Sequence, residues 1–243
     1  MVCLLRHSRG LLALCAFLPF PLVAQVGETF AQFQQATGNN SRPFVFDHQG
    51  ASATFNTADI VTGTEVEFDF KTNPFSGILA SLNNTVQARM IMVSQTASLA
   101  QQLTPTLINQ RVDSGFIEFR ALVPVDNRDL LLRVDFTHAE LNVLFNSLGS
   151  FVALDYQNSA TLAYSSEFLL FSGAYEGLSI SLSGINPPTS IAGGFLSDFS
   201  ANVTGMFDGQ IVAVLIPEPS SAVTGLVVAG LLGAIWRRRR KAS

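Results

Sequence analysis

TEVEFDFK, residues 64–71, is the stretch of this sequence that decides the fold, because apolar and charged side chains alternate strictly along it. One phase is apolar and the other is charged: Val66, Phe68 and Phe70 against Glu65, Glu67, Asp69 and Lys71. Successive side chains of a β-strand point to opposite faces, so the alternation predicts a half-buried strand. A helix would scatter the same charges around its circumference.

The same two-residue period recurs from residue 44 to residue 215, with turn signals such as Asn186-Pro187-Pro188 and Gly193-Gly194 between the runs. Phenylalanine falls mostly on the inward phase, and Ser, Thr and Asn fill much of the outward phase. Many short strands at intervals of roughly ten residues are typical of an all-β, antiparallel β-sandwich. We therefore predict a sandwich of this class, jelly-roll-like in its connections. The predicted strands are 44–47, 64–71, 85–94, 116–122, 130–136, 151–157, 160–172, 177–184, 199–207 and 210–215.

Three segments do not follow this period. Thr137-His138-Ala139-Glu140 fits a capping box, and apolar residues follow it at helical spacing up to Gly149, which predicts one short helix. A second short helix is an open alternative within residues 25–40. Residues 96–111 are polar and contain Thr104-Pro105, so we expect a long connection there, with at most one helical turn.

The first 24 residues have the order of a secretory signal peptide. Arg6, His7 and Arg9 precede an apolar run from Leu11 to Phe20, and Ala24 offers a small residue before a cut at Gln25. A lipoprotein signal at Cys15 is disfavoured, because Leu14 occupies a position that requires a small residue. We therefore divide the chain into residues 1–24 as signal peptide, 25–216 as one exported domain, and 217–243 as a separate C-terminal segment.

The C-terminal segment combines an extended peptide, an apolar run and a basic cluster. The run from Ala222 to Trp236 would form a helix of about 22 Å, short for a hydrocarbon core of about 30 Å but extendable by snorkelling Arg side chains. The cations place that end on the cytoplasmic side, and the prolines keep the preceding peptide out of the helix. The residues that define the two flanks are Pro217, Glu218 and Pro219, and Arg237, Arg238, Arg239, Arg240 and Lys241.

This order resembles the PEP-CTERM sorting signal of bacterial exosortase substrates, and the resemblance covers about the last 27 residues. It implies recognition by an exosortase-like membrane protease near Pro217-Glu218-Pro219, with removal of the helix and the basic tail. It also implies export across the inner membrane, transient anchoring by the C-terminal helix, and delivery to the cell surface or the extracellular space. The central domain has no such assignment. An ordinary permanent anchor is the alternative for the tail.

Charge and cysteine content exclude several functions for the exported domain. Taking Arg6, Arg9, Arg237–Arg240 and Lys241 from 14 basic residues leaves 7 between residues 25 and 216, against 17 acidic ones, a net charge near −10. Such a domain lacks the excess of basic residues with which proteins bind nucleic acid. Both cysteines, Cys3 and Cys15, lie in the signal peptide, which excludes disulfides, thiolate metal sites and a cysteine nucleophile from the domain.

Few side chains of the domain suggest chemistry. We interpret Glu65, Glu67 and Asp69 as a solvated strand face, because glycosidase carboxylates stand across a cleft. A calcium site would have to use an Asp/Asn-rich turn, and Asx residues are common in turns for backbone reasons alone. His48 and His138 are expected in surface roles, and a sugar-stacking platform would use Tyr156, Tyr164 and Tyr175. The calcium candidates are Asp126, Asn127 and Asp129.

The sequence therefore favours a non-enzymatic exported protein without a cofactor, with a structural or adhesive role at the cell surface or in the extracellular matrix. The alternative is a carbohydrate-binding module for the cell envelope or an exopolysaccharide. Solvent-facing aromatic side chains on one sheet would favour the alternative, and a face made only of Ser, Thr and Asn would count against it.

Overall fold

The structure is a computed structural model that describes residues 28–36, 42–71, 82, 85–125, 127–145, 148–154, 161–173 and 176–212. The predicted signal peptide, the sorting triplet, the apolar run and the basic cluster lie outside the described residues. Within the described residues, no helix is long and apolar enough to cross a membrane.

The regular elements of the described residues are β-strands. In chain order they are β1 (Glu28–Gln35), β2 (Phe44–Gln49), β3 (Ser52–Thr57), β4 (Thr64–Phe70), β5 (Val86–Gln95), β6 (Gln101–Thr104), β7 (Leu107–Val125), β8 (Arg128–Leu144), β9 (Leu148–Leu154), β10 (Thr161–Ser165), β11 (Leu170–Phe171), β12 (Gly177–Asn186), β13 (Ile191–Ala192), β14 (Phe195–Leu196), β15 (Phe199–Gly209) and β16 (Ile211–Val212).

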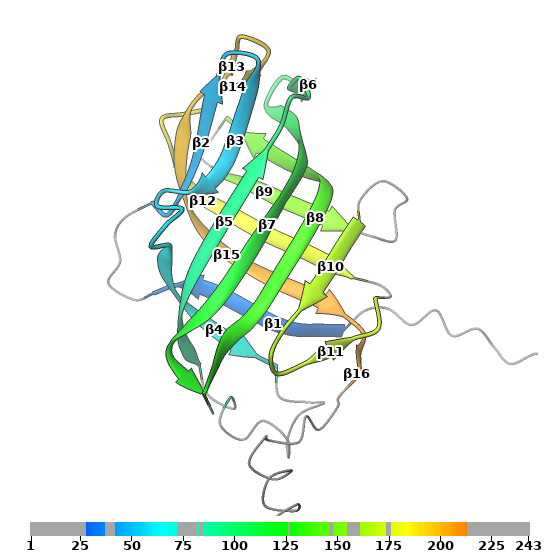
Figure 1. The fold of residues 1–243 in the computed structure, drawn as a ribbon. Helices are drawn as coiled ribbons and strands as arrows, with labels where there is room; N and C mark the ends of the chain where they lie inside the picture. Colours follow the sequence, from blue (N-terminus) through cyan, green and yellow to red (C-terminus); the bar gives the residue numbers. More distant parts are fainter. Residues whose placement is uncertain are drawn as a thin grey trace, which may run out of the picture.

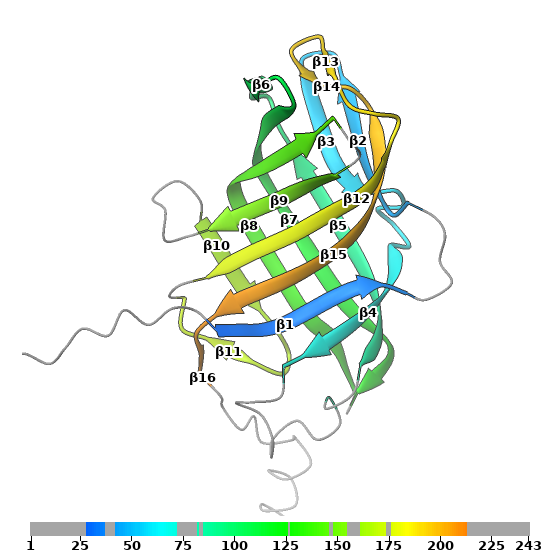
Figure 2. The ribbon, with the colours of Figure 1, turned by 180° about the vertical axis from the view of Figure 1, so that it is seen from behind.

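The main sheet closes on itself. Its strands are hydrogen-bonded in the order β1-β4-β5-β7-β8-β9-β12-β15, and β15 pairs again with β1, antiparallel throughout. Figures 1 and 2 show the two layers that result: β5, β7 and β8 on one side, and β9, β12, β15 and β1 on the other, with the strands of one layer crossing those of the other. The prediction of an all-β antiparallel sandwich is confirmed, with the two layers joined into one closed sheet.

The connections are simpler than those expected from the sequence. Around the closed sheet the strands keep their order along the chain, from β1 to β15, although shorter strands are inserted between some neighbours. This is a meander, whereas a jelly roll has Greek-key connections. The β2–β3 hairpin extends the sheet beyond β15, and on its other side Ala53 forms a bridge with Thr96, the residue after β5.

Phenylalanine fills the space between the layers. Phe119 of β7 lies 4.9 Å from Phe33, 4.9 Å from Phe68 and 5.5 Å from Phe207, measured between ring centroids. A second group joins Phe44, Phe46, Phe55, Phe136, Phe151 and Phe199 toward β2 and β3. Large side chains are needed here because packed sheets stand about 10 Å apart. The predicted inward phase of phenylalanine is therefore confirmed for these residues.

The stretch TEVEFDFK forms β4 as predicted. Val66, Phe68 and Phe70 are buried, Glu65 is exposed, and the intervening Glu67 and Asp69 are half-buried. The strand is fixed on both sides, because Phe68 pairs with Phe33 of β1 and with Val86 of β5.

The helix predicted from Thr137 to Gly149 is wrong. Residues 137–144 continue β8, where Ala139, Leu141 and Val143 are buried between β7 and β9. His138 has a positive φ of 56°, and burial changes phase here from Phe136 to Ala139. Two inward residues three positions apart resemble helical spacing, although the backbone is extended on both sides. The Thr137 hydroxyl bonds that of Thr161 at 2.7 Å instead of capping a helix.

The possible helix within residues 25–40 and the long connection at 96–111 are also corrected. A register shift between Thr29 and Ala31 puts Phe30, Ala31 and Phe33 of β1 in the core, which again resembles helical spacing. In the second segment, Thr104 pairs with Leu107 across a tight turn at Pro105-Thr106, so the polar residues form the β6–β7 hairpin. Polar composition here reflects exposure of β6 rather than irregular backbone.

Candidate functional site

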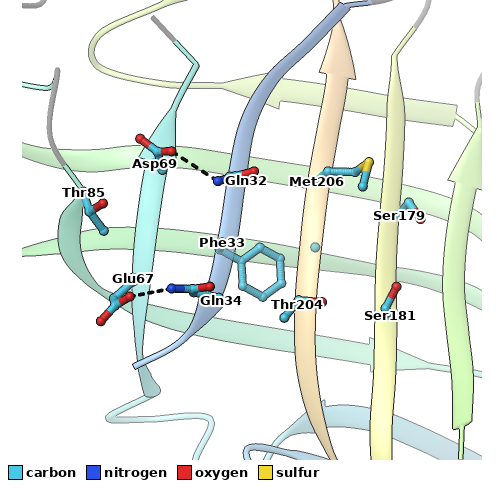
Figure 3. A pocket seen from close by; sticks show the side chains of 11 residues that line it. Gln32, Phe33, Gln34, Glu67, Asp69, Thr85, Ser179, Ser181, Thr204 and Met206 are labelled. Atoms are coloured by element: carbon cyan, nitrogen blue, oxygen red, sulfur yellow. Dashed lines mark hydrogen bonds between the residues drawn. The ribbon is translucent and has the colours of Figure 1, made fainter. Parts of the chain in front are cut away.

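A polar hollow lies on the outer face of four adjacent strands, β4, β1, β15 and β12 (Figure 3). Its volume is about 240 Å³. Pockets that enclose drug-sized ligands usually measure about 300–1,000 Å³, so this hollow would hold a single small group or one unit of a longer chain. Its lining residues are Gln32, Phe33, Gln34, Glu67, Asp69, Thr85, Ser179, Ser181, Thr204, Gly205 and Met206.

One wall of the hollow is a double row of paired amides and carboxylates. Gln34 donates a hydrogen bond of 2.7 Å to Glu67, and Gln32 donates one of 3.2 Å to Asp69. The pairs follow from the register, since Gln34 stands opposite Glu67 and Gln32 opposite Asp69 in the β1–β4 ladder. The Lys71 ammonium also lies 3.3 Å from the Asp69 carboxylate, so this wall combines amide, carboxylate and ammonium groups.

The opposite wall is lined by small hydroxyl groups. Ser179 and Ser181 of β12 stand opposite Met206 and Thr204 of β15, and all four side chains face outward. Serine is short, which leaves the surface hollowed beside the longer glutamine and carboxylate side chains. This wall can both donate and accept hydrogen bonds, whereas the ionised carboxylates only accept them.

Gly205 and Phe33 form the floor. Gly205 of β15 pairs with Phe33 of β1, and a Cβ on Gly205 would lie 2.3 Å from Cε1 of the Phe33 ring. The ring therefore occupies the space that any larger residue would need. Phe33 is only 2% exposed, so the apolar surface available to a ligand comes mainly from Met206, which is 47% exposed.

The sequence predicted part of this site. It placed Glu65, Glu67 and Asp69 on a solvated face, and the alternation of Ser179 and Ser181 put these serines outward. It did not bring the two sets together, because that requires the order β4-β1-β15-β12. Gln32 and Gln34 were missed because the sequence around them left a helix and a strand as alternatives. The two-residue spacing of these glutamines is the feature that would have indicated a shared strand face.

The calcium hypothesis stays untested, since Asp126 lies outside the described residues. Asn127 has a φ of 61° in the β7–β8 turn, a conformation that asparagine tolerates well. The Asp129 carboxylate accepts a hydrogen bond of 2.9 Å from Arg120. Within the part of the chain that the structure describes, no group of three or more His, Cys, Asp or Glu side chains could hold a metal ion.

The described histidines and tyrosine have structural contacts. The His48 ring stacks on Phe195 at 5.0 Å and shares a hydrogen bond of 2.9 Å with the Gly50 carbonyl. His138 is exposed at the phase change of β8. Tyr164 packs against Phe30, and its hydroxyl donates to the Gly177 carbonyl. Burial raises the pKa of Tyr164 well above its ordinary value, and the nearby Glu176 charge adds to the increase. Tyr156 and Tyr175 lie outside the described residues.

The fold and the hollow together define a closed β-sandwich with a polar site on its outer face. A family model described as the PEP-CTERM protein-sorting motif matches residues 215–240. The predicted resemblance of the tail is thereby confirmed, and the motif indicates an extracellular protein that an exosortase sorts. No curated protein and no solved structure matches the chain.

Proposed function

We propose that the chain is a non-enzymatic surface protein whose β-sandwich has a structural or adhesive role after exosortase sorting. The observation that carries the proposal is the sorting motif at residues 215–240, since it directs whatever precedes it to the outside of the cell. In this proposal the apolar run from Ala222 to Trp236 holds the chain in the membrane only until cleavage near Pro217-Glu218-Pro219.

The contacts inside the domain support a structural role. Phe30, Phe33, Phe119 and Phe207 tie the two layers together through one aromatic cluster. On the outer face of β7 and β8, Glu118 binds Arg120 and Arg133 at 2.6 and 3.2 Å, and the Arg133 guanidinium lies 4.0 Å from the centre of the Phe116 ring. A domain whose two layers are joined by buried aromatic contacts, with ion pairs on its surface, suits a protein that acts outside the cell.

The sorting step is tested with the full chain in a bacterium that has an exosortase. We expect the intact mass of the mature wild-type protein to lack the apolar run and the basic cluster Arg237–Lys241. Replacing Pro217, Glu218 and Pro219 by alanine should leave the tail in place, because the extended peptide that the protease recognises is lost. Ser220→Ala is the matched control and should be processed normally. Recovery of wild-type protein that still has its basic cluster would contradict the proposal.

A second candidate function is binding of a neutral carbohydrate in the polar hollow. The observation that favours it is the pairing of two fixed carboxylates with Ser179 and Ser181 across one hollow, because a sugar presents donors and acceptors on all sides. Against it, the large exposed apolar side chains among the described residues are aliphatic or methionine, so sugar stacking on an aromatic ring has no support there.

The binding candidate is tested by titrating the mature protein with a panel of neutral oligosaccharides. Ser181→Leu fills the hollow and should weaken any binding by about tenfold or more, equivalent to about 1.4 kcal/mol. Ser183→Leu lies on the same exposed face of β12 but outside the hollow, and should bind as the wild type does. Equal loss in both variants, or no binding by the wild type, would rule out this use of the hollow.

A further inference from the structure

The hollow on the outer face is a trough rather than a round pocket. Its polar lining forms two rows that run across β4, β1, β15 and β12, as Figure 3 shows. Members of a row stand directly opposite one another in the neighbouring ladders. The first row is Glu67, Gln34, Thr204 and Ser181. The second row lies two residues away on each strand and runs from Asp69 to Ser179.

The geometry of the sheet sets the dimensions of the trough. Neighbouring strands stand about 4.8 Å apart, so each row extends about 14 Å from β4 to β12. The rows are two residues apart along each strand, a separation of about 7 Å. A volume of about 240 Å³ spread over this length makes the trough shallow. A long, narrow ligand can contact both ends of the trough, whereas a compact ligand of the same volume cannot.

The floor between the rows is mostly backbone, because the intervening residues belong to the inward phase of each strand. Phe68 of β4 and Ile180 of β12 are fully buried, and Phe33 of β1 is nearly so. Gly205 of β15 has no side chain, and the Phe33 ring occupies the space that one would need. The polar side chains of the two rows therefore stand on either side of a floor made of backbone and part of one aromatic ring.

The two rows suit a neutral ligand that has many hydroxyl groups. Thr204 and Ser181 offer hydroxyl groups, which both donate and accept hydrogen bonds. Toward β4, the side chains of Gln32 and Gln34 are held by their carboxylate partners, and side chains that are ordered before binding lose less conformational entropy when a ligand docks. The carboxylates, together with the 17 acidic and 7 basic residues between 25 and 216, repel an anionic polymer.

The two rows continue past β12 onto β9. Ser150 stands opposite Ser181, and Val152 stands opposite Ser179. Both β9 residues are half-buried and have short side chains. A ligand longer than the trough can therefore extend over β9. The arrangement fits a segment of a polymer better than a small free molecule.

We infer that the trough binds an extended, neutral, β-1,4-linked polysaccharide that lies across the strands, with successive sugar units over β4, β1, β15 and β12. The distance between neighbouring strands is close to the length of one sugar unit in such a chain. These chains are extended ribbons, whereas α-1,4-linked chains curve and would leave the trough. The inference rests on the carbohydrate-binding candidate of the proposed function, and it adds a linkage and a direction to that candidate.

The dependence of affinity on ligand length tests the inference. The mature protein is titrated with β-1,4-linked gluco-, manno- and xylo-oligosaccharides of increasing length, and with malto-oligosaccharides of the same lengths as curved controls. We expect at least one β-1,4-linked series to bind, with an affinity that increases about tenfold or more from the disaccharide to the tetrasaccharide, because the tetrasaccharide reaches from β4 to β12. The tetrasaccharide of the malto series should bind about tenfold more weakly or worse.

Serine variants test the direction in which the chain lies. Ser150→Leu should weaken binding of the hexasaccharide by about tenfold, because leucine obstructs the path over β9. Ser183→Leu lies two residues from Ser181 along β12 and should leave this affinity unchanged. Ser165→Leu is the matched control at an exposed position of β10, away from the trough, and should also bind as the wild type does.

The possible failures are distinguishable. Equal affinity for the monosaccharide and the tetrasaccharide, stronger binding of the malto series, or unchanged hexasaccharide affinity in Ser150→Leu would overturn the inference and leave carbohydrate binding intact. Weaker binding by Ser183→Leu would do the same, because it would place the ligand along the strands. Absence of binding by every oligosaccharide would overturn the carbohydrate-binding candidate as well.

Discussion

Replacing Phe119 by alanine is expected to lower the free energy of unfolding by about 3–5 kcal/mol. The Phe119 ring is fully buried and contacts Phe33, Phe68 and Phe207, so it joins β7 to the strands of the other layer. Its removal leaves a cavity between two layers that the closed sheet prevents from collapsing together. Urea unfolding of the mature protein, followed by circular dichroism, measures the change.

Val123→Ala is the matched control for this prediction. Val123 lies on the same strand but is 76% exposed, and its truncation should change stability by less than about 0.5 kcal/mol. Phe119→Leu should fall between the control and the alanine variant, because it keeps part of the buried volume. A loss below about 1 kcal/mol for Phe119→Ala would mean that the aromatic cluster is not the main link between the layers.

Replacing Gln110 by leucine is expected to destabilise the protein by about 1–3 kcal/mol. The Gln110 side chain is fully buried in β7 and bonds the Ser98 carbonyl and the Leu196 amide. Leucine has similar volume but no polar atoms, so both backbone groups would be left buried without this partner. The loss should be local to the β6 segment and the β13–β14 hairpin, which the Ala100 amide also joins through the Gly194 carbonyl. Hydrogen exchange of the Leu196 and Ala100 amides should accelerate more than that of the β9–β12 ladder.

The control for Gln110 is Gln87→Leu, an exposed position on β5. It changes the same functional group without removing a buried hydrogen bond, and its effect should stay within about 0.5 kcal/mol. If exchange of the Leu196 and Ala100 amides were unchanged in Gln110→Leu, the Gln110 side chain would not be the link between the β6 segment and the β13–β14 hairpin.

Strands with a strict two-residue period could be predicted from the sequence. Phe68 and Phe70 of β4 belong to this class, as do Leu178, Ile180 and Leu182 of β12, because one face of each strand is buried and the other is solvated. Segments with a change of phase could not. At Thr29–Ala31 and around His138, an extended backbone puts buried residues at spacings that a helix also produces. Only the hydrogen-bonding partners in neighbouring strands distinguish the two cases.

The outward orientation of individual residues in the candidate site could be predicted, but their grouping into one site could not. Glu67 and Ser181 each lie on a strand face that the alternation identifies as outward. Their grouping depends on β1 standing between β4 and β15, a pairing that joins Thr29 to Asp208 across a separation of 179 residues. Local patterns contain no information about such distant pairs.

The pairing of β1 with β15 also sets the order in which the domain can mature outside the cell. β1, the first described strand, cannot pair with β15, the last long strand, until nearly the whole domain is present. Closing so large a loop carries a high entropic cost and slows folding. Until β1 pairs with β15, the sheet has two open edges. β15 ends at Gly209, shortly before the sorting motif at residues 215–240, so the sheet can close only when nearly all of the chain that precedes the motif is present.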